Sequence, residues 1–162
     1  MSDLDEQHRT AFITAMRGVA HSVCVVTTQG AGGRAGATVS AFSSVSADPP
    51  TALICLNTET RIATDVVANG FFNINILPQT AIHIANRFAG MDDEKVQDRF
   101  DGIELIDADY PVIKGATLFH CQVQEAITAG SHKVIIGLVL ESRQVAERPL
   151  MYFNGDYCKV DV

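Results

Sequence analysis

A run of small hydroxyl side chains between two expected strands is the part of this chain best suited to hold a ligand. Five hydroxyls fall within nine residues, at Thr38, Ser40, Ser43, Ser44 and Ser46. Hydroxyls and free backbone N–H groups at an irregular strand end are neutral donors for a phosphate or for the polar edge of a heterocycle. The alternative is an edge strand whose hydroxyls bond to its own turn. The residues alone leave both interpretations open.

Two further places could bring charge to such a ligand. Thr60 and Arg61 stand at the start of an expected helix, where free N–H groups, the positive end of the helix dipole and a guanidinium coincide. His132 and Lys133 follow Gly130 in a turn between two long expected strands. A histidine there can reach a ligand from a rigid scaffold, and a lysine can supply positive charge. Simple exposure to solvent is the alternative at both places.

Sequence signatures of metal and nucleophile chemistry are absent. The five histidines, at positions 8, 21, 83, 120 and 132, form no HxxxH, HExxH or HxH arrangement. The closest pair of cysteines, Cys24 and Cys55, is 31 residues apart, which excludes CxxC redox and zinc-ribbon spacing. No GxSxG or SxxK pattern occurs. The sequence therefore predicts no metal site and no serine nucleophile, and its cysteines are expected to be reduced thiols.

The elements that must position these residues are mostly strands. Apolar residues spaced three and four apart predict helices, and β-branched or alternating runs predict strands. Asn154-Gly155 is the strongest turn signal of the chain. We expect helices at 2–19, 60–69 and 78–90, strands at 22–28, 36–46, 51–57, 71–77, 116–127, 133–145, 150–153 and 156–160, and a charged excursion at 92–102. This pattern is mainly β with α decorations, and it predicts an antiparallel barrel with short helices and an N-terminal helix.

A glycine-rich segment tests the main alternative fold. Gly30, Gly32 and Ala35 match the GxGxxG/A pattern of a dinucleotide-binding Rossmann fold. That fingerprint must open a helix, whereas residues 36–46 are rich in serine and β-branched residues and run into Pro49-Pro50. The sequence therefore favours a β-hairpin over a Rossmann fold.

Composition limits the partners. The chain has 162 residues, which at about 150 residues per domain predicts one domain over 1–162. Its 12 Lys and Arg against 19 Asp and Glu give a net charge of −7, so no basic field exists for nucleic acid or an anionic membrane. Residues 1–10 are polar and acidic, unlike a signal peptide, and no apolar run approaches the roughly 18 residues of a membrane span. We expect a cytoplasmic protein.

Several of these segments, in this order, resemble one family. They are GATVSAFSSVSADPP at 36–50, LICLN at 53–57, GFFNINIL at 70–77, FAG at 88–90 and GSH at 130–132. The chain resembles the short-chain flavin reductases, and more closely the reductase component of two-component flavin-dependent monooxygenases, of which the 4-hydroxyphenylacetate 3-monooxygenase reductase is the best-known type. The resemblance covers residues 12–160, and its central block, TVSAFSSVSADPP followed by CLN, is specific.

The resemblance implies a fold and an activity. The implied fold is the FMN-binding split β-barrel, as a homodimer with the flavin pocket close to the subunit interface. The implied activity is reduction of FMN or FAD by NADH or NADPH, with hydride passing from nicotinamide C4 to flavin N5, and the reduced flavin goes to a separate monooxygenase. Such a site works by orienting two stacked rings and needs no triad. An alternative is a flavoprotein that holds its flavin tightly and passes electrons to a corrin or a metal centre.

The resemblance also implies which residues contact the cofactors. Family positions along the flavin ring, ribityl chain and phosphate match Thr38, Val39, Ser40, Ser43, Ser44, Cys55, Leu56, Asn57, Thr60 and Arg61. Phe88 and Ala89 match positions near the outer part of the flavin, and Tyr157 matches a further cofactor contact. His132 matches a histidine beside the nicotinamide and is the expected catalytic residue. Lys133, with Arg61, is expected to give the site a local positive lining.

Overall fold

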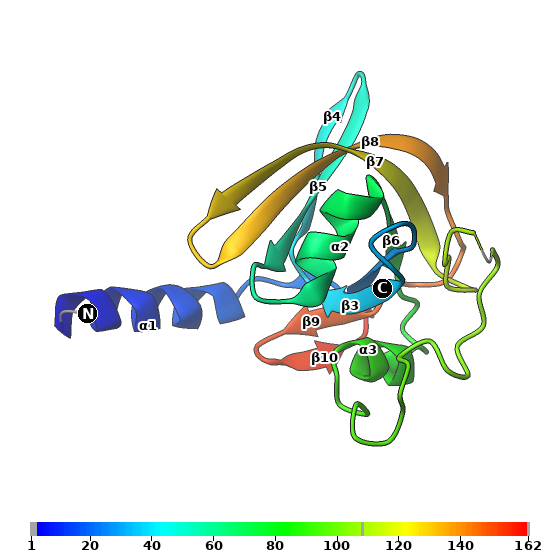
Figure 1. The fold of residues 1–162 in the computed structure, drawn as a ribbon. Coiled ribbons are helices and arrows are strands. Elements are labelled where there is room, and N and C mark those ends of the chain that lie inside the picture. The colour runs from blue at the N-terminus through cyan, green and yellow to red at the C-terminus, as the bar shows by residue number, and fades with distance from the viewer. Residues whose placement is uncertain (1–2, 108, 162) are drawn as a thin grey trace.

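A seven-stranded antiparallel sheet forms the body of the protein in the computed structural model, which describes residues 3–107 and 109–161 (Figure 1). The strand order is β3-β2-β6-β7-β8-β5-β4, so β3 and β4 are its two edges. The bounds are β2 (Cys24–Thr28), β3 (Ala35–Val39), β4 (Phe42–Ala47), β5 (Pro50–Asn57), β6 (Phe71–Ile76), β7 (Thr117–Ala129) and β8 (His132–Arg143). The sheet curls without closing, which confirms the predicted mainly β fold of split-barrel type.

The segment 36–46 differs from the single strand that we expected. β3 pairs with β2 as the second arm of the predicted hairpin, with Thr28 opposite Ala35 and Cys24 opposite Val39. The chain then turns at Ser40 and Ala41, where the N–H of Phe42 donates to the carbonyl of Ser40 (3.1 Å), and it continues as β4 against β5. One run of β-forming residues therefore supplies both edges of the sheet. The sequence did not indicate the break at Ser40, because no glycine or proline stands there.

A smaller sheet confirms the predicted closing hairpin. Its order is β1-β9-β10, with bounds β1 (His21–Ser22), β9 (Met151–Phe153) and β10 (Asp156–Cys158). Asn154 and Gly155 connect β9 and β10 with φ of 52° and 84°. Both values lie in the left-handed region that a two-residue hairpin turn requires, and asparagine and glycine tolerate that region best.

Two short helices pack against the sheet. α2 (Arg61–Asn69) ends where predicted, at Gly70, whose φ of 75° suits a glycine C-cap and whose N–H donates to the carbonyl of Val66 (3.0 Å). α3 (Ile82–Phe88) is shorter than the helix expected over 78–90. Residues 78–81 form a turn instead of a helix. Pro78 pairs with Pro149 in a β-bridge, and the carbonyl of Pro78 accepts the N–H of Ala81 (2.9 Å).

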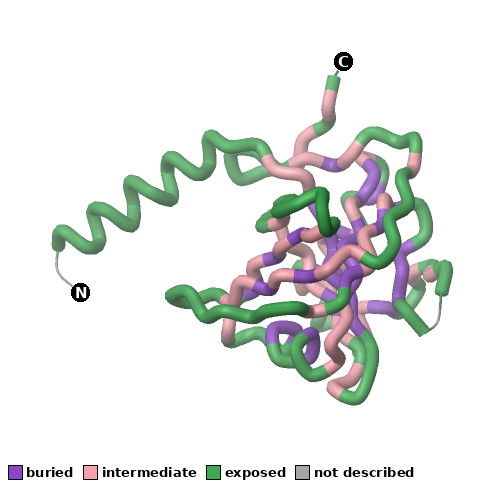
Figure 2. The backbone as a smooth tube through the Cα atoms, turned by 90° about the horizontal axis from the view of Figure 1, so that it is seen from above, coloured by how far each residue is buried: buried purple, intermediate pink, exposed green. Residues whose placement is uncertain are grey.

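The N-terminal helix α1 (Asp3–Arg17) confirms the helix expected there, although Ser2 lies outside the described residues. The helix extends away from the body as an arm (Figures 1 and 2), and none of its described residues is buried. Leu4 and Phe12 are each 65% exposed. An amphipathic helix is stabilised by packing its apolar side against another surface, and this chain alone does not provide that surface.

Two hydrophobic clusters hold the sheet together. One fills the inside of the curled sheet and includes Val26, Ile54 and Ile74, and the other lies between the sheet and α3 and includes Val25 and Phe88. All five residues of β2 are buried, because both of its faces are covered. The cysteines are free thiols, and burial raises the pKa of both Cys24 and Cys121 to about 12. No helix in the described part of the chain is long and apolar enough to cross a bilayer.

The outer face of strands β5 and β8 is apolar although it is not covered. Leu53 pairs with Ile136, and Thr51 pairs with Leu138, and all four are partly exposed. The residues between them, such as Ile54 and Ile135, point into the core. A sheet face that meets only water normally carries polar side chains. We call Leu53, Val134, Ile136 and Leu138 the outer apolar face.

Candidate active site

A cleft beside β3 collects most of the residues that the sequence singled out. Its volume is about 290 Å³. It is lined by Ala37, Thr38, Val39, Ser40, Ala41, Cys55, Leu56, Asn57, Thr60, Ile62 and His132. We call this cavity the β3 cleft. The structure thus brings together three segments that are far apart in sequence: the end of β3, the end of β5 and the start of β8.

Packing against α3 fixes the position of β3. A Cβ atom on Gly36 would lie 2.5 Å from Cε1 of Phe88, so only glycine lets the strand approach this ring. The hydroxyl of Thr38 donates to the carbonyl of Ala85 in α3 (2.7 Å). That hydroxyl is therefore bonded within the protein, so Thr38 can offer a ligand only its backbone and its methyl group. As an edge strand, β3 pairs only with β2 in the described chain, which leaves N–H and C=O groups on its other side without a strand partner.

The first turn of α2 opens toward the same cleft. Thr60 precedes the helix, but its hydroxyl donates to the carbonyl of Asn57 (2.6 Å) and makes no side-chain cap. Arg61 is the first helical residue, its side chain is 74% exposed, and its Nε donates to Oδ2 of Asp65 (3.1 Å). This pairing engages Nε, and the described residues make no hydrogen bond with the two Nη groups, of which Nη2 lies beside Gly33. Free helix N–H groups beside a guanidinium form a site for an anion.

A larger cavity continues from the β3 cleft past the start of α2. Its volume is about 550 Å³, and it shares Ala37, Thr60 and Ile62 with the β3 cleft. Its other lining residues are Arg34, Ala35, Gly36, Arg61, Gln97, Asp98, Arg99 and Phe100. We call it the arginine cavity. Arg34 forms an ion pair with Asp98, and Nη2 of Arg99 lies 2.7 Å from Oδ2 of Asp93.

A third cavity continues from the other end of β3. Its volume is about 280 Å³, and it is lined by Val23, Thr38, Val39, Ser40, Tyr152 and Tyr157. The rings of Tyr152 and Tyr157 meet at 67° with centroids 5.7 Å apart. Burial, and then the neighbouring Tyr152, raise the pKa of Tyr157, so its hydroxyl stays protonated at neutral pH and can donate a hydrogen bond. Each of the other two cavities shares three lining residues with the β3 cleft, so the three adjoin one another along β3, and we call them together the groove along β3.

His132 stands at the mouth of the β3 cleft. It is exposed, it pairs with Asn57 across β5 and β8, and its Nδ1 lies 2.9 Å from the hydroxyl of Ser131. No group in the described residues bonds its Nε2, which leaves that nitrogen for a ligand. Cys55 lies two residues before Asn57 on the same face of β5, and burial raises the pKa of its thiol.

Five of the residues expected at the site lie outside the three cavities. Ser43 and Ser44 are exposed on β4, where the Ser43 hydroxyl donates to the carbonyl of Ser44 (3.0 Å). Lys133 pairs with Leu56 and so points to the face opposite His132. The rest are in and after α3: Phe88 is 1% exposed and packs its ring edge against Phe100, and Ala89 is exposed at the helix end.

The sequence interpretation missed several lining residues. Ala37, Ala41 and Ile62 have side chains without chemistry, and only their position beside hydroxyl residues could have indicated a role. Arg34 lies in the glycine-rich segment and Arg99 in the charged excursion over 92–102, where the sequence indicated no ligand contact. These two reach the groove because the excursion folds back onto β3, where Nη1 of Arg99 donates to the carbonyls of Gly36 (3.3 Å) and Phe88 (3.1 Å).

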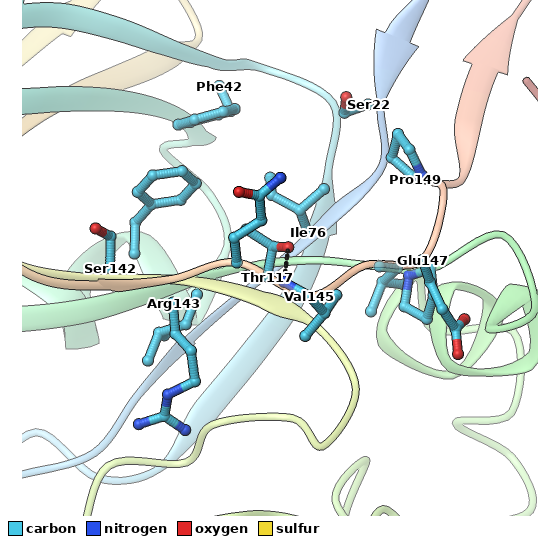
Figure 3. A pocket seen from close by; sticks show the side chains of 14 residues that line it. Ser22, Phe42, Ile76, Thr117, Ser142, Arg143, Val145, Glu147 and Pro149 are labelled. Atoms are coloured by element: carbon cyan, nitrogen blue, oxygen red, sulfur yellow. Dashed lines mark hydrogen bonds between the residues drawn. The ribbon is translucent and has the colours of Figure 1, made fainter.

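A separate apolar cavity lies at the far end of β8. Its volume is about 490 Å³, and Figure 3 shows Phe42, Ile76, Val145 and Pro149 around it, with the Arg143 side chain pointing away from Phe42. It contains none of the residues that the sequence singled out. Over residues 3–107 and 109–161, no group of three or more His, Cys, Asp or Glu side chains is placed to hold a metal ion.

Curated relatives and solved structures resemble this chain over nearly its whole length. "FMN reductase (NADH) RutF" of Agrobacterium fabrum is 33% identical over 94% of this chain and 88% of its own length. "4-hydroxyphenylacetate 3-monooxygenase reductase component" of Pseudomonas aeruginosa is 35% identical over 97% and 94%. The structure "Flavin reductase PheA2 in native state" covers all of both chains with a TM-score of 0.86 and 29% identity. These relatives are oxidoreductases.

The family model described as "Flavin reductase like domain" matches residues 16–161, which include every lining residue of the three cavities along β3. The groove along β3 thus lies within the matched residues, and the named relatives are flavin reductases. The chain belongs to the flavin reductase family.

Proposed function

We propose that the chain is an NAD(P)H:flavin oxidoreductase whose groove along β3 binds FMN or FAD as a substrate. The observation that carries the proposal is that the start of α2 lines both the β3 cleft, through Thr60 and Ile62, and the adjoining arginine cavity, through the same two residues and Arg61. The names of the relatives, FMN reductase (NADH) and flavin reductase (NADH), favour reduction of free flavin over the alternative of a tightly held flavin that serves a corrin or metal centre, and they favour NADH as the donor. We further propose that residues 1–162 form one flavin reductase-like domain, which the match to 16–161 supports.

The donor set of the groove fits a flavin nucleotide. The outer edge of β3 offers alternating N–H and C=O groups, and the pyrimidine edge of an isoalloxazine ring carries matching acceptors and donors. The small side chains of Ala37 and Ala41 leave room for a flat ring beside the strand. The first turn of α2, with Arg61, suits the phosphate that ends the ribityl chain.

These residues would promote the reaction by orientation and electrostatics. When both cofactors are bound, the nicotinamide supplies a hydride to the flavin ring stacked on it. The N–H groups of β3 stabilise negative charge on the pyrimidine edge of the ring. His132 holds the nicotinamide at the open side of the cleft through its free Nε2. Arg61 retains the phosphate and so fixes the ring along the strand.

The first experiment follows NADH and NADPH oxidation by the purified protein with and without FMN, FAD or riboflavin. We expect oxidation only when flavin is added, since the proposed flavin is a substrate that exchanges. A protein that is yellow as purified and does not accelerate NADH oxidation when flavin is added would contradict the proposal. Heat-denatured protein and free flavin with NADH are the controls for uncatalysed oxidation.

The Arg61→Ala variant should bind FMN about tenfold more weakly, because a guanidinium–phosphate contact contributes about 1.5–3 kcal/mol to binding. Turnover at saturating FMN should fall only modestly, since this contact acts equally on the ground state and the transition state. Riboflavin, which has no phosphate, is the matched control ligand, and its affinity should not change. Equal FMN affinity in both proteins by titration calorimetry would remove Arg61 from the site.

The His132→Ala variant should slow the reduction of bound flavin by NADH by about tenfold while flavin affinity stays within about twofold. The reason is that His132 stands at the open side of the cleft, and Ser131 engages only its Nδ1. Rapid-mixing absorbance at the flavin band measures the reduction step, and Ser131→Ala tests whether the Nδ1 contact orients the ring. Parallel losses in flavin binding and reduction would indicate structural damage instead.

We also propose a homodimer, a cytoplasmic location and a separate monooxygenase partner. The outer apolar face supports the dimer, because it runs along β5 and β8 directly into Cys55, Asn57 and His132 of the β3 cleft. The exposed apolar side of α1 supports it as well. Free thiols support the cytoplasmic location. The relative from Pseudomonas aeruginosa, named as the reductase component of a monooxygenase, supports the partner.

A further inference from the structure

The guanidinium of Arg99 closes one end of the outer edge of β3. Its Nη1 donates to the carbonyl of Gly36 in β3 (3.3 Å) and to the carbonyl of Phe88 at the end of α3 (3.1 Å). Gly36 lines the arginine cavity, whereas Thr38, two residues later, lines the β3 cleft. Arg99 is therefore bonded to the strand edge along which the flavin ring is proposed to lie, although it does not line the β3 cleft itself.

Only every second residue of β3 presents its main-chain groups to this outer edge. In an antiparallel pair, the N–H and C=O of one residue point to the same side of the strand, and those of its neighbours point to the other side. The Gly36 carbonyl accepts from Arg99 and so points away from β2. Thr38 presents its N–H and C=O in the same direction. Within β3 these are the two outward residues, and Arg99 occupies the carbonyl of one of them.

We propose that Arg99 is a positioning residue for flavin reduction, which restricts the ring to one register along β3; this inference rests on the proposed function. The pyrimidine edge of an isoalloxazine ring needs an N–H donor and a C=O acceptor together, and Thr38 offers both. If the Gly36 carbonyl were free, the same pair of groups would recur about 6.7 Å along the strand. A ring bound there would lie in the arginine cavity, which His132 does not line, and so away from the proposed nicotinamide position.

Asp93 holds the Arg99 guanidinium in this place. Nε of Arg99 donates to Oδ1 of Asp93 (2.9 Å) and Nη2 donates to Oδ2 (2.7 Å), which makes the pair bidentate. The hydrogen bonds from Arg99 lower the pKa of Asp93, so its carboxylate stays ionised at neutral pH. A Cβ atom on Gly90 would lie 2.9 Å from Nη2 and 3.0 Å from Oδ2, so a glycine there leaves room for the pair. With Nε and Nη2 fixed, Nη1 is directed at the two carbonyls.

The Arg99→Ala variant tests the proposal with riboflavin, which has the ring but no phosphate, so the lost positive charge does not act on the ligand. Rapid mixing of the protein–riboflavin complex with saturating NADH gives the rate of reduction, and titration calorimetry gives the affinity. Reduction should slow at least about twofold, because a second, equivalent register halves the population of the productive one. Affinity should stay equal or rise by up to the same factor, since binding gains a register. Arg99→Lys should restore the rate, because its ammonium can donate to the same carbonyl.

Arg87→Ala is the matched control. Arg87 ties the same charged excursion to α3, through Oδ2 of Asp92 (3.2 Å) and the carbonyl of Asp101 (2.7 Å). In the described part of the chain it makes no hydrogen bond to β3. This variant removes one positive charge and one attachment of the excursion but leaves the strand edge as it is, so it should reduce bound riboflavin at the wild-type rate.

Three outcomes would overturn the inference. One is a wild-type rate of reduction in Arg99→Ala. The second is a weaker affinity of this variant for riboflavin, which would indicate a damaged site and not a second register. The third is an equal slowing by Arg87→Ala, which would assign the effect to the excursion as a whole.

The proposed function fails by a different result, in which wild type itself neither binds riboflavin or FMN nor oxidises NADH when flavin is added. Circular dichroism confirms that each variant is folded at the assay temperature. If Arg99→Ala is not folded, Arg99→Met, which keeps an unbranched side chain without a donor, gives the same test with the same expected rate and affinity.

Discussion

Replacing Phe88 by alanine is expected to destabilise the protein by about 3–5 kcal/mol, the usual cost of removing a buried phenyl ring. Phe88 is 1% exposed and supports β3 through Gly36 and the excursion through Phe100. Urea unfolding followed by circular dichroism measures the loss. The resemblance placed this residue beside the flavin, so the experiment separates a supporting role from a contacting role.

Phe153→Ala is the matched control, because Phe153 is 45% exposed and should contribute less than about 1 kcal/mol. At low temperature, where the Phe88→Ala variant is folded, we expect the free energy of flavin binding to change by less than the free energy of unfolding. If the Phe88→Ala variant has the same urea midpoint of unfolding as wild type while its flavin affinity drops, the ring contacts the cofactor and does not support β3.

Replacing Ile136 by aspartate should convert the proposed homodimer to a monomer and reduce flavin affinity at least tenfold. The carboxylate would stand in the centre of the outer apolar face, opposite Leu53, and burying it there in an interface costs several kcal/mol. The β3 cleft borders this face through Cys55 and His132, so its open side would lose the wall that the second copy is proposed to supply. Sedimentation velocity gives the mass, and calorimetry gives the affinity.

Ile106→Asp controls for this change of charge and shape. Ile106 is 51% exposed in the loop between α3 and β7, away from β5 and β8. Its variant should sediment and bind flavin as wild type does. A wild-type protein that sediments as a monomer, or an Ile136→Asp variant that remains a dimer, would exclude the outer apolar face as the interface.

The sequence predicted those parts of the fold that local chemistry determines. The glycine stop of α2 at Gly70 and the Asn154-Gly155 turn need φ values that few other residues adopt, so both can be predicted from the sequence alone. The break at Ser40 cannot be predicted from the local sequence, since it depends on β3 and β4 pairing with different strands of the curled sheet. The same holds for α3, which a bridge between Pro78 and Pro149 shortens.

The site was predictable where its residues are neighbours in the chain. Thr38, Val39 and Ser40 were chosen together and lie together in the β3 cleft. Arg34 was not chosen, because its stacking on Phe100 comes from a loop more than sixty residues later that folds back onto β3. Contacts between distant segments leave no local periodicity, and residue type alone does not separate Phe88 in the core from a phenylalanine on a ligand.

The main feature of the β3 cleft is a strand edge rather than a set of functional side chains. Its lining from Ala37 to Ala41 is small, and the hydroxyl of Thr38 is already bonded to Ala85. Recognition by main-chain groups depends on where the strand lies and not on which side chains it bears. Such a site can be retained while most of the side chains around it are substituted. Its substrate range can then diversify among descendants through the surrounding loops, such as 92–102, without a change in the chemistry of hydride transfer.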